Sequence, residues 1–377
     1  MDIYQHKDSF GNLNQTHSIQ EKVRYLHETL KRRHPFVERV AVVLYEPSTD
    51  MLSTYVHSSD GPSPLDHYQA RLAECGSLLD LLEKKRPRVV NDLSLFSDGG
   101  QTHTKLIGQV GYRASYTMPL FAEGVFLGFL FFNSTQENVF EEHVLRELDM
   151  TGHLIAFMLY SEQGKVKTLV ATVRSAKQLS HHRDPETGSH LERMAHYSRL
   201  IAMEIADEFG FSDQYIEHVF LFSPLHDIGK ITIPDNILLK PGKLTDNEYE
   251  VMRTHSKNGR DIIDSLLQNY GLDGVEYIEL LRNIALYHHE AVDGSGYPEH
   301  LQQEEIPIEA RIVSVADVFD ALTSERPYKA AWSNEDAFAK LKEMSGSKLD
   351  EKCVQALLKH EQEIVQIQRR FFENSFG

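Results

Sequence analysis

The sequence has few of the residues that would place it in several protein classes. Only two of its 377 residues are cysteines, Cys75 and Cys353, and they stand far apart in no metal-ligand spacing. We therefore expect no disulfide framework, which fits a reducing compartment. Positive charge is also scarce, because 39 lysines and arginines face 56 acidic residues and give a formal net charge of -17. Such a composition argues against a nucleic-acid polymer as partner, since non-specific binding requires a basic surface.

Long hydrophobic runs are also missing. The most apolar stretch, residues 116–133, contains Pro119 and Glu123 and is interrupted at Gly124. A membrane-spanning helix needs about 20 consecutive apolar residues, so we expect no membrane span. The first residues, MDIYQHKDSFGNLNQ, lack the basic start and apolar core of a signal peptide. We expect a soluble, cytoplasmic protein.

The length favours two domains, which we place at residues 1–160 and 161–377. Residues 18–33 have the pattern of an amphipathic helix, and 39–47 and 51–59 have that of two strands. Further along come a hairpin over 112–134 with its turn at Ala122–Glu123–Gly124, and a helix over 141–160. This order predicts an α+β domain in which helices cover one sheet.

The first domain resembles the GAF family of small sensory domains, mainly through SYTMPLFAEGVFLGFLFFNS over residues 115–134. The resemblance covers roughly residues 15–160 and implies a domain that binds a small ligand or mediates dimerisation. No residue stands out as a cofactor ligand, and Cys75 is better explained as a structural residue. The ligand, if the domain takes one, is unknown.

Apolar residues recur at steps of three and four along the segment that leaves the first domain. They are Val144, Leu148, Leu154, Met158, Val166, Leu169, Val173, Ala176 and Leu179. The second half of this set fits a coiled-coil seam. Two interpretations stay open: the segment packs on its own domains, or it pairs two protomers. We expect a homodimer through this linker helix.

The second domain has mostly helical spacing, as in residues 190–210, 247–271 and 306–325, and no strong strand pattern. We predict an all-α bundle with a set of histidines and carboxylates on elements that are all helical. They are Glu186, His190, His226, Asp227, His255, His288, His289 and Asp317. Helical bundles build metal sites from such inward-facing side chains. Nitrogen and oxygen donors without thiolate suit Fe, Mn or Zn and disfavour a closed structural zinc site.

Several blocks of the second domain resemble the HD-GYP family, a branch of the HD-domain metallophosphohydrolases. These blocks are RDPETGSHLERMAHYSRLIA (183–202), HDIGK (226–230), HHEAVDGSGYP (288–298) and VADVFDALTSERPYK (315–329). The resemblance covers about residues 165–360. It implies a phosphodiesterase that cleaves cyclic di-GMP through two or three divalent metal ions, of which iron is the first choice.

The resemblance also assigns the metal ligands residue by residue. It implies that His190, His226, Asp227 and Asp317 are ligands of one metal and that Asp227 bridges this metal to a second one. The second metal would be held by His255, His288 and His289, and Glu186 matches the acid of members that hold a third. Water between two dications is acidified into a hydroxide that can attack phosphorus. Asp227 and Lys230 are the residues we place in catalysis.

Other residues are expected to contact the substrate or to support the site. The resemblance gives Lys230 to the scissile phosphate or its leaving oxygen, and Arg326 and Lys329 to the substrate phosphates. It also gives Asp184 and Tyr297 to the substrate. Asp320 either touches the ligand or orients a histidine. The supporting residues are Asp293, which would stabilise the turn and orient a histidine, and Gly294 and Gly296, which permit backbone angles closed to other residues.

One segment departs from the family. Members carry a stretch similar to Gly-Thr-His-Phe-Asp-Pro, whereas this chain reads GSKLDEKCV over 346–354 and keeps only the aspartate, Asp350. Because of this departure, the resemblance does not predict where the local helix starts or how tightly the substrate pocket is closed. Three alternatives to cyclic di-GMP hydrolysis to pGpG, or onward to GMP, also stay open. They are hydrolysis of another cyclic dinucleotide such as cyclic GMP-AMP, a generic HD phosphohydrolase, and a receptor that binds without turnover.

Overall fold

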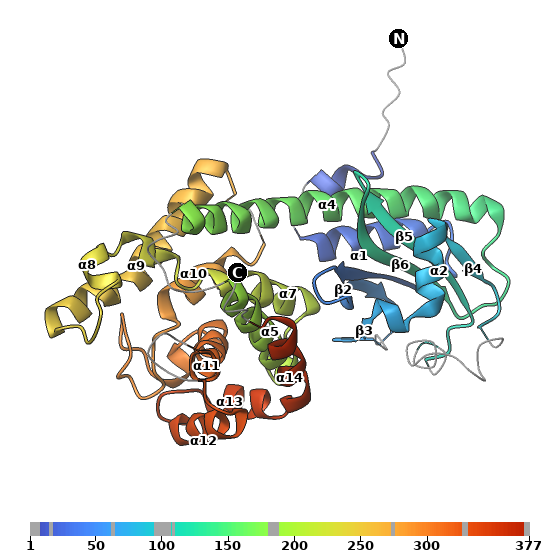
Figure 1. The fold of residues 1–377 in the computed structure, drawn as a ribbon. Helices are drawn as coiled ribbons and strands as arrows, with labels where there is room; N and C mark the ends of the chain where they lie inside the picture. The colour runs from blue at the N-terminus through green and yellow to red at the C-terminus, as the bar shows by residue number, and fades with distance from the viewer. Residues whose placement is uncertain are drawn as a thin grey trace, which may run out of the picture. The chain divides into compact units, whose positions relative to one another are not determined.

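The chain divides into two compact units, Met1–Gly164 and Lys165–Gly377, each described by itself (Figure 1). The structure is a computed structural model, and it describes residues 8–14, 18–61, 65–93, 107, 110–179, 188–272, 276–325 and 331–372. Within α4, the side chains of residues 174 and 176–179 also lie outside the description. In the described residues no helix is long and apolar enough to cross a bilayer.

The N-terminal unit is built on one six-stranded sheet of order β3-β2-β1-β6-β5-β4. Its strands are β1 Arg39–Glu46, β2 Met51–Ser59, β3 Gln69–Arg71, β4 Arg88–Val90, β5 Ala114–Ala122 and β6 Val125–Ser134. All neighbouring strands are antiparallel. The predicted hairpin is confirmed as β5–β6, and its turn is the pair Glu123–Gly124, both with positive φ. Such a two-residue turn matches the twist of the flanking strands.

Helices cover both faces of this sheet. One face packs on α1, Ile19–Lys31, which Ser18 caps, and on the first half of α4, Glu142–Leu179. The other face carries α2, Gly76–Lys84, and the 3-10 turn η2, Leu72–Glu74. A further 3-10 turn, η1, spans Gly11–Asn14. The α+β prediction for the first domain is confirmed, and β3, β4 and α2 are elements that the sequence did not indicate.

The long helix α4 begins in the N-terminal unit and ends in the C-terminal unit. Val144 and Leu148 are buried in the core of the first unit, and Val166, Leu169 and Val173 are buried in the core of the second. These positions of the expected seam therefore pack on their own units, which was the first of the two interpretations. Ala176 and Leu179 lie outside the described side chains.

In its described residues the C-terminal unit has helices and connecting turns but no named strand, as predicted. Its α-helices after α4 are α5 Gly188–Glu204, α6 Ala206–Phe209, α7 Asp213–Phe222, α8 Asp235–Leu238, α9 Asp246–Tyr270, α10 Ile278–Tyr287, α11 Ile308–Thr323, α12 Asn334–Met344, α13 Glu351–Leu358 and α14 Glu361–Arg370. Its 3-10 turns are η4 Ser223–Leu225, η5 Ile228–Thr232 and η6 Gln303–Glu305.

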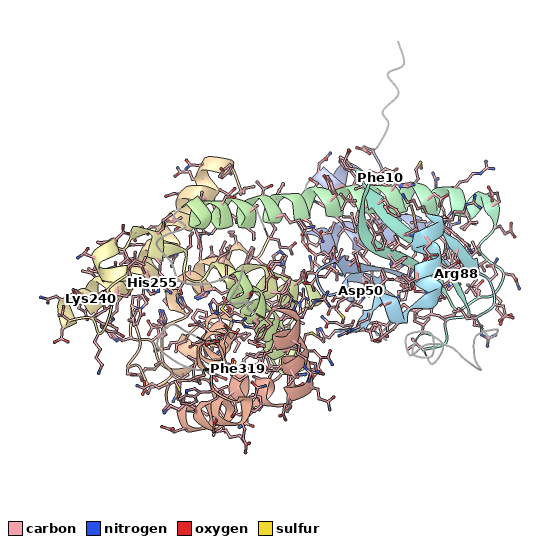
Figure 2. The ribbon with its side chains drawn as sticks, in the orientation of Figure 1. Phe10, Asp50, Arg88, Lys240, His255 and Phe319 are labelled. Atoms are coloured by element: carbon pink, nitrogen blue, oxygen red, sulfur yellow. The ribbon has the colours of Figure 1, made fainter. Side chains whose placement is uncertain are left out.

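The C-terminal unit has a main apolar core, to which α5, α10 and α11 contribute fully buried side chains, and a smaller cluster around Val292, Ile306 and Ala310. Figure 2 labels His255 on α9 and Phe319 on α11. Phe319 belongs to the core and has no exposed surface. The apolar faces of α9, α10 and α11 thus anchor the helices whose polar residues build the site described next.

Candidate metal centre

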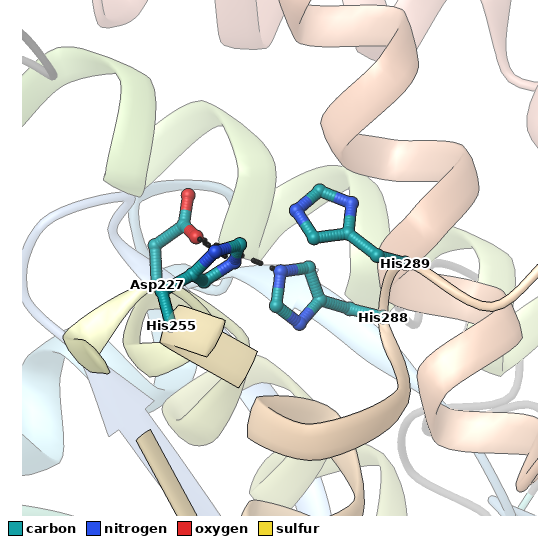
Figure 3. Close-up of side chains that lie close together, drawn as sticks. All are labelled: Asp227, His255, His288 and His289. Atoms are coloured by element: carbon teal, nitrogen blue, oxygen red, sulfur yellow. Dashed lines mark ion pairs between the residues drawn. The ribbon is translucent and has the colours of Figure 1, made fainter. Parts of the chain in front are cut away.

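Seven predicted residues meet in two groups. One group is Asp227, His255, His288 and His289, and the other is His190, His226 and Asp317. In each group the potential ligand atoms lie within 4.8 Å of one another. Figure 3 shows the four side chains of the first group close together. Asp227 directly precedes η5, His255 lies on α9, and His288 and His289 follow α10. The five histidines and two carboxylates come from five separate places along the chain, so only tertiary structure unites them.

Asp227 connects the two groups. Its Oδ1 atom is 3.1 Å from Nε2 of His255 and 3.6 Å from Nε2 of His288. Its Oδ2 atom is 3.0 Å from Nε2 of His226, which belongs to the other group. A single carboxylate that faces one group with each oxygen has the placement required to bridge two cations.

The hydrogen bonds of four histidines decide which ring nitrogen faces the centre. Nδ1 of His226, His255 and His288 lies within 2.9 Å of the carbonyl oxygens of Ser223, Met252 and Ile284 respectively. In His190, Nδ1 lies 2.7 Å from Oδ2 of Asp320. Each Nδ1–H donates to these acceptors, so each Nε2 lone pair points to the centre. This arrangement fits a bound metal, because ligand histidines donate their other N–H in this way.

Close backbone packing brings Asp227 to His255. Gly229 in η5 lies against α9 so closely that a Cβ atom on it would be 1.8 Å from the carbonyl oxygen of His255. Gly259 on α9 faces the Gly229 backbone from the other side of this contact. The prediction that every site element is helical is wrong in part. Asp227 sits between two 3-10 turns, and His288 and His289 follow the end of α10.

The electrostatics keep Asp227 charged and favour neutral imidazoles at His288 and His289. Burial alone would raise the pKa of Asp227, but the Lys230 ammonium and His226 hold this pKa well below its ordinary value. Burial lowers the pKa of His288. Burial and the neighbouring His288 together hold the pKa of His289 well below its ordinary value. Neutral imidazoles and an ionised carboxylate are the protonation states that metal ligands need.

Lys230 also reaches the centre. Its Nζ atom lies 2.6 Å from Oδ2 of Asp227, and its side chain remains partly exposed. The two residues are three apart within a 3-10 turn rather than in an α-helix. Lys230 therefore carries a positive charge at the open edge of the centre, beside the bridging carboxylate.

The turn after His289 is held to it by backbone contacts. The Tyr297 N–H donates to the carbonyl of His289 at 3.2 Å. Gly294 has a φ of +78°, so it needs the freedom that was predicted for it. Gly296 is required for a different reason, since a Cβ atom there would lie 2.2 Å from the amide nitrogen of Ala291. Close approach, and not an unusual φ, explains this second glycine.

Tyr297 lies beside the first group of ligand residues. Its ring centroid is 4.8 Å from that of His289 and 6.2 Å from that of His255. The guanidinium of Arg253, on α9, lies 4.8 Å from the Tyr297 ring. The sequence reasoning missed Arg253, although its four-residue spacing from Tyr249, whose ring it also approaches, could have indicated a shared helical face.

Asp320 has no exposed surface, which argues against substrate contact and favours its alternative role of orienting a histidine. Besides His190, it accepts hydrogen bonds from Nε and Nη2 of Arg193 at 2.7 and 3.0 Å and from the Ser324 hydroxyl at 2.8 Å. Arg193 was missed by the sequence reasoning. It follows His190 by three positions on α5, and this spacing was the available signal.

The atypical segment 346–354 packs on the turn. Lys348 donates to Oδ2 of Asp293 at 2.9 Å and also contacts the Ser295 hydroxyl, while Asp293 accepts from the Ser295 N–H. These bonds give Asp293 its expected place in stabilising the turn. In the described residues Asp293 forms no hydrogen bond or ion pair with a site histidine. The Nδ1 atoms of His190, His226, His255 and His288 bond to Asp320 or to backbone carbonyls instead.

The start of the following helix is intact despite the missing proline. Asp350 caps α13, accepting from the Cys353 N–H at 3.0 Å, and it pairs with Arg311 at 2.7 Å. Leu349 fills the buried position where the family has an aromatic residue. Four predicted residues, Asp184, Glu186, Arg326 and Lys329, lie outside the described residues.

Comparison with known proteins agrees with this architecture. Residues 24–159 match the GAF domain family, and residues 180–353 match the HD domain family. A cyclic di-GMP phosphodiesterase response regulator, RpfG of Xanthomonas campestris, is 42% identical over 226 residues, which are 60% of this chain and 56% of that protein. A cyclic di-GMP phosphodiesterase of Thermotoga maritima is 44% identical over 192 residues, or 51% of this chain and 49% of that protein.

A third relative acts on a different messenger. The 3′3′-cGAMP-specific phosphodiesterase 2 of Vibrio cholerae is 38% identical over 185 residues, or 49% of this chain and 33% of that protein. The chain thus spans about half or less of the length of these relatives. The matches agree with the resemblance found in the sequence: this chain carries a GAF domain followed by an HD domain, and it is similar in sequence to cyclic di-GMP phosphodiesterases.

Proposed function

We propose that this chain is a metal-dependent phosphodiesterase that hydrolyses cyclic di-GMP to linear pGpG, with GMP as a further product if the second bond is also cleaved. The observation that carries the proposal is the placement of Asp227 between two groups of ligand atoms, with Lys230 and Tyr297 beside them. The cyclic di-GMP phosphodiesterases among the relatives support the choice of substrate.

The ligand set fits two divalent ions, and we propose iron first, with manganese or zinc as substitutes. The imidazoles of His190, His226, His255 and His288 present Nε2 to the centre, and no thiolate takes part. Bound divalent ions supply an activated water and neutralise phosphate charge. Glu186 is the residue we propose for a third ion.

The chain's own residues would orient the substrate and handle the leaving group. Water adds across one phosphodiester, the P–O3′ bond breaks, and a 5′-phosphate remains on the linear product. We propose that Nζ of Lys230 turns from Asp227 to the scissile phosphate, where its N–H stabilises the negative charge on the leaving oxygen. The Tyr297 ring stacks on or bonds to the nucleotide, and burial keeps its phenol neutral by raising its pKa.

Positively charged side chains near the metal centre would bind the second phosphate of the substrate. The Arg253 guanidinium lies over the Tyr297 ring, so it would also be near a nucleotide that Tyr297 contacts. Arg326 and Lys329 are our proposed partners for the phosphates, in keeping with the resemblance. Local cations of this kind are needed because the protein as a whole, with its formal charge of -17, repels anions.

The direct test is hydrolysis by the purified full chain, loaded separately with Fe, Mn and Zn, against cyclic di-GMP, 3′3′-cGAMP and a nucleoside triphosphate. We expect pGpG from cyclic di-GMP as the fastest reaction. Faster cleavage of 3′3′-cGAMP would move the substrate to the other class of relative, and faster cleavage of the triphosphate would favour a generic HD phosphohydrolase. Tight binding of cyclic di-GMP without product by metal-loaded protein would make the chain a receptor.

We further propose that the N-terminal unit binds a small ligand that regulates this activity, and that two copies of the chain pair through α4. The stripe Met150, Leu154 and Phe157 repeats at four and three residues on α4, and Met150 and Phe157 are 72% and 62% exposed. A second copy offers the same stripe, as a twofold interface requires. Cytoplasmic location stays a prediction from composition.

Sedimentation of the full chain tests the dimer. Phe157→Glu is expected to shift it to a monomer, whereas Val125→Glu, which changes an exposed apolar residue of the β5–β6 hairpin, is expected to leave the dimer intact. A monomeric wild-type protein, or a Phe157→Glu variant that remains dimeric, would rule out this interface.

A further inference from the structure

Arg39 is a buried cation in the N-terminal unit. It begins β1 and is 2% exposed, which places it among the largest fully buried side chains of the described residues. The next residue, Val40, belongs to the core beneath α1 and α4. Because side chains alternate along a strand, Arg39 lies on the opposite face of the sheet.

The neighbours of Arg39 on this face are neutral. Its Nη1 atom donates to Oδ1 of Asn133 at 2.9 Å, and Nδ2 of Asn133 donates to the Ser115 hydroxyl at 3.1 Å. The register places these three residues in one row across β1, β6 and β5, and all three are buried. Thr117, also buried, follows two positions along β5. These residues form a buried polar strip on this face of the sheet.

In the described part of the chain, Arg39 forms no ion pair, and its Nε atom has no acceptor. Two other buried arginines do have carboxylate partners: Arg193 binds Asp320 through Nε and Nη2, and Arg199 binds Glu217 at 2.7 Å. Asp66, whose charge acts on Arg39 from a distance, is instead paired with His57 at 3.1 Å. Arg39 is thus the exception among the buried arginines described.

A buried charge without a counter-ion is costly, and at Arg39 the water that is lost is replaced by a neutral amide rather than by an anion. Burial lowers the pKa of Arg39 to about 10, with Tyr112 and Asp66 acting in the other direction, so the guanidinium remains charged at neutral pH. A fold that keeps this cost without an internal counter-ion leaves the guanidinium available to an external anion.

We propose that Arg39 is the recognition group of a binding site for a small molecule that carries a carboxylate or phosphate, and this rests on the proposed ligand of the N-terminal unit. The guanidinium fork matches both oxyanions. Asn133, Ser115 and Thr117 offer neutral polar groups to the rest of the molecule. Tyr112 packs with Leu65 and Ile107 in a small cluster of residues from connections between strands, which rearrange more readily than the sheet.

A first test is to supply the missing counter-ion from within the chain. Asn133→Asp places a carboxylate where the neutral amide now accepts from Nη1. We expect the midpoint of thermal unfolding to rise, because the buried cation gains its partner. Asn91→Asp is the matched control, since Asn91 bonds to the backbone of Phe140, and here the midpoint is expected to fall. A lower midpoint in Asn133→Asp would overturn the proposal.

A second test measures anion binding by the full chain with calorimetry, using inorganic phosphate and succinate as separate probes. We expect saturable binding of one or both, lost in Asn133→Asp and in Arg39→Gln, and retained in Asp227→Asn, which alters the metal centre. Binding of neither probe, or equal binding in wild type and Asn133→Asp, would overturn the proposal. If Arg39→Gln fails to fold, Asn133→Asp still decides the question. The readout involves no hydrolysis, so its failure is distinct from failure of the phosphodiesterase proposal.

Discussion

Nδ1 of His190 lies 2.7 Å from Oδ2 of Asp320, a carboxylate with no exposed surface. This bond fixes the ring so that Nε2 faces His226 and Asp317. Arg193 donates hydrogen bonds to both oxygens of the same carboxylate. The orientation of His190 is therefore determined by a buried network of three side chains.

Asp320→Asn is expected to weaken metal binding by roughly 10- to 100-fold, as loss of a hydrogen bond to a metal ligand does in other proteins. The asparagine amide is neutral and has one accepting oxygen, so it cannot replace the carboxylate that accepts from both His190 and Arg193. Metal titration of metal-free protein would measure the change, and excess metal should restore much of the activity. Asp350→Asn, which alters a carboxylate paired with Arg311, should leave metal affinity unchanged. Equal metal affinity in Asp320→Asn and wild type would show that Asp320 does not position His190.

Gly296→Ala is expected to reduce activity, because the new Cβ would lie 2.2 Å from the backbone nitrogen of Ala291 and 2.5 Å from the carbonyl oxygen of His289. Either the turn with Tyr297 or the His289 segment must move, at a cost of about 1–3 kcal/mol in the free energy of unfolding. Steady-state hydrolysis and chemical denaturation would measure both effects. Gly164→Ala, at an open position of α4, should change neither by much. Wild-type activity in Gly296→Ala would show that the tight turn is unimportant.

Lys348→Met is expected to raise the KM for the cyclic dinucleotide by a few-fold at most. Lys348 joins Asp293 and Ser295 to segment 346–354, but the ion pair is exposed to solvent and therefore contributes little to stability. Kinetics at low and high salt would show the effect shrinking as the pair is screened. The comparison is Lys352→Met, since Lys352 pairs with Glu208 away from the turn. A large fall in kcat instead would give Lys348 a role in the reaction itself.

Buried His218 is expected to make the protein less stable in acid. Burial lowers its pKa from 6.5 to about 4, so between these values the unfolded chain binds a proton that the folded chain does not. Stability is therefore lost as the pH falls from 6.5 toward 4, by about 3 kcal/mol in total. His218→Gln should flatten the pH dependence of the unfolding free energy in this range, and His143→Gln, at an exposed position, should not. An unchanged slope in His218→Gln would contradict this assignment.

The parts of the fold that the sequence predicted were set by local chemistry. Ser18 caps α1, the Glu123–Gly124 pair turns the hairpin, and alternation marks β1 and β2. The expected seam on α4 failed to distinguish a dimer contact from a core contact, because Leu148 and Val166 have the same helical spacing in either case. Burial against the two separate cores could be known only from tertiary structure.

The same limit applies to the centre. The motifs indicated which residue types gather, and the structure brings seven of those residues into two groups. Spacing could not show that Asp320 is enclosed by Arg193, because the two lie 127 positions apart. Nor could it show that Arg39 is enclosed by neutral residues, since its partner Asn133 is 94 positions away.

We propose that Asp227 joins two sites for divalent ions and that hydrolysis requires both sites to be occupied. The most direct measurement is the number of metal ions per chain, determined by elemental analysis of anaerobically purified protein and compared with hydrolysis of cyclic di-GMP in the same sample. We predict that activity appears only with two or more ions per chain, and that Asp227→Asn loses both the second ion and activity. Full activity with one ion per chain, or with none, would contradict the account.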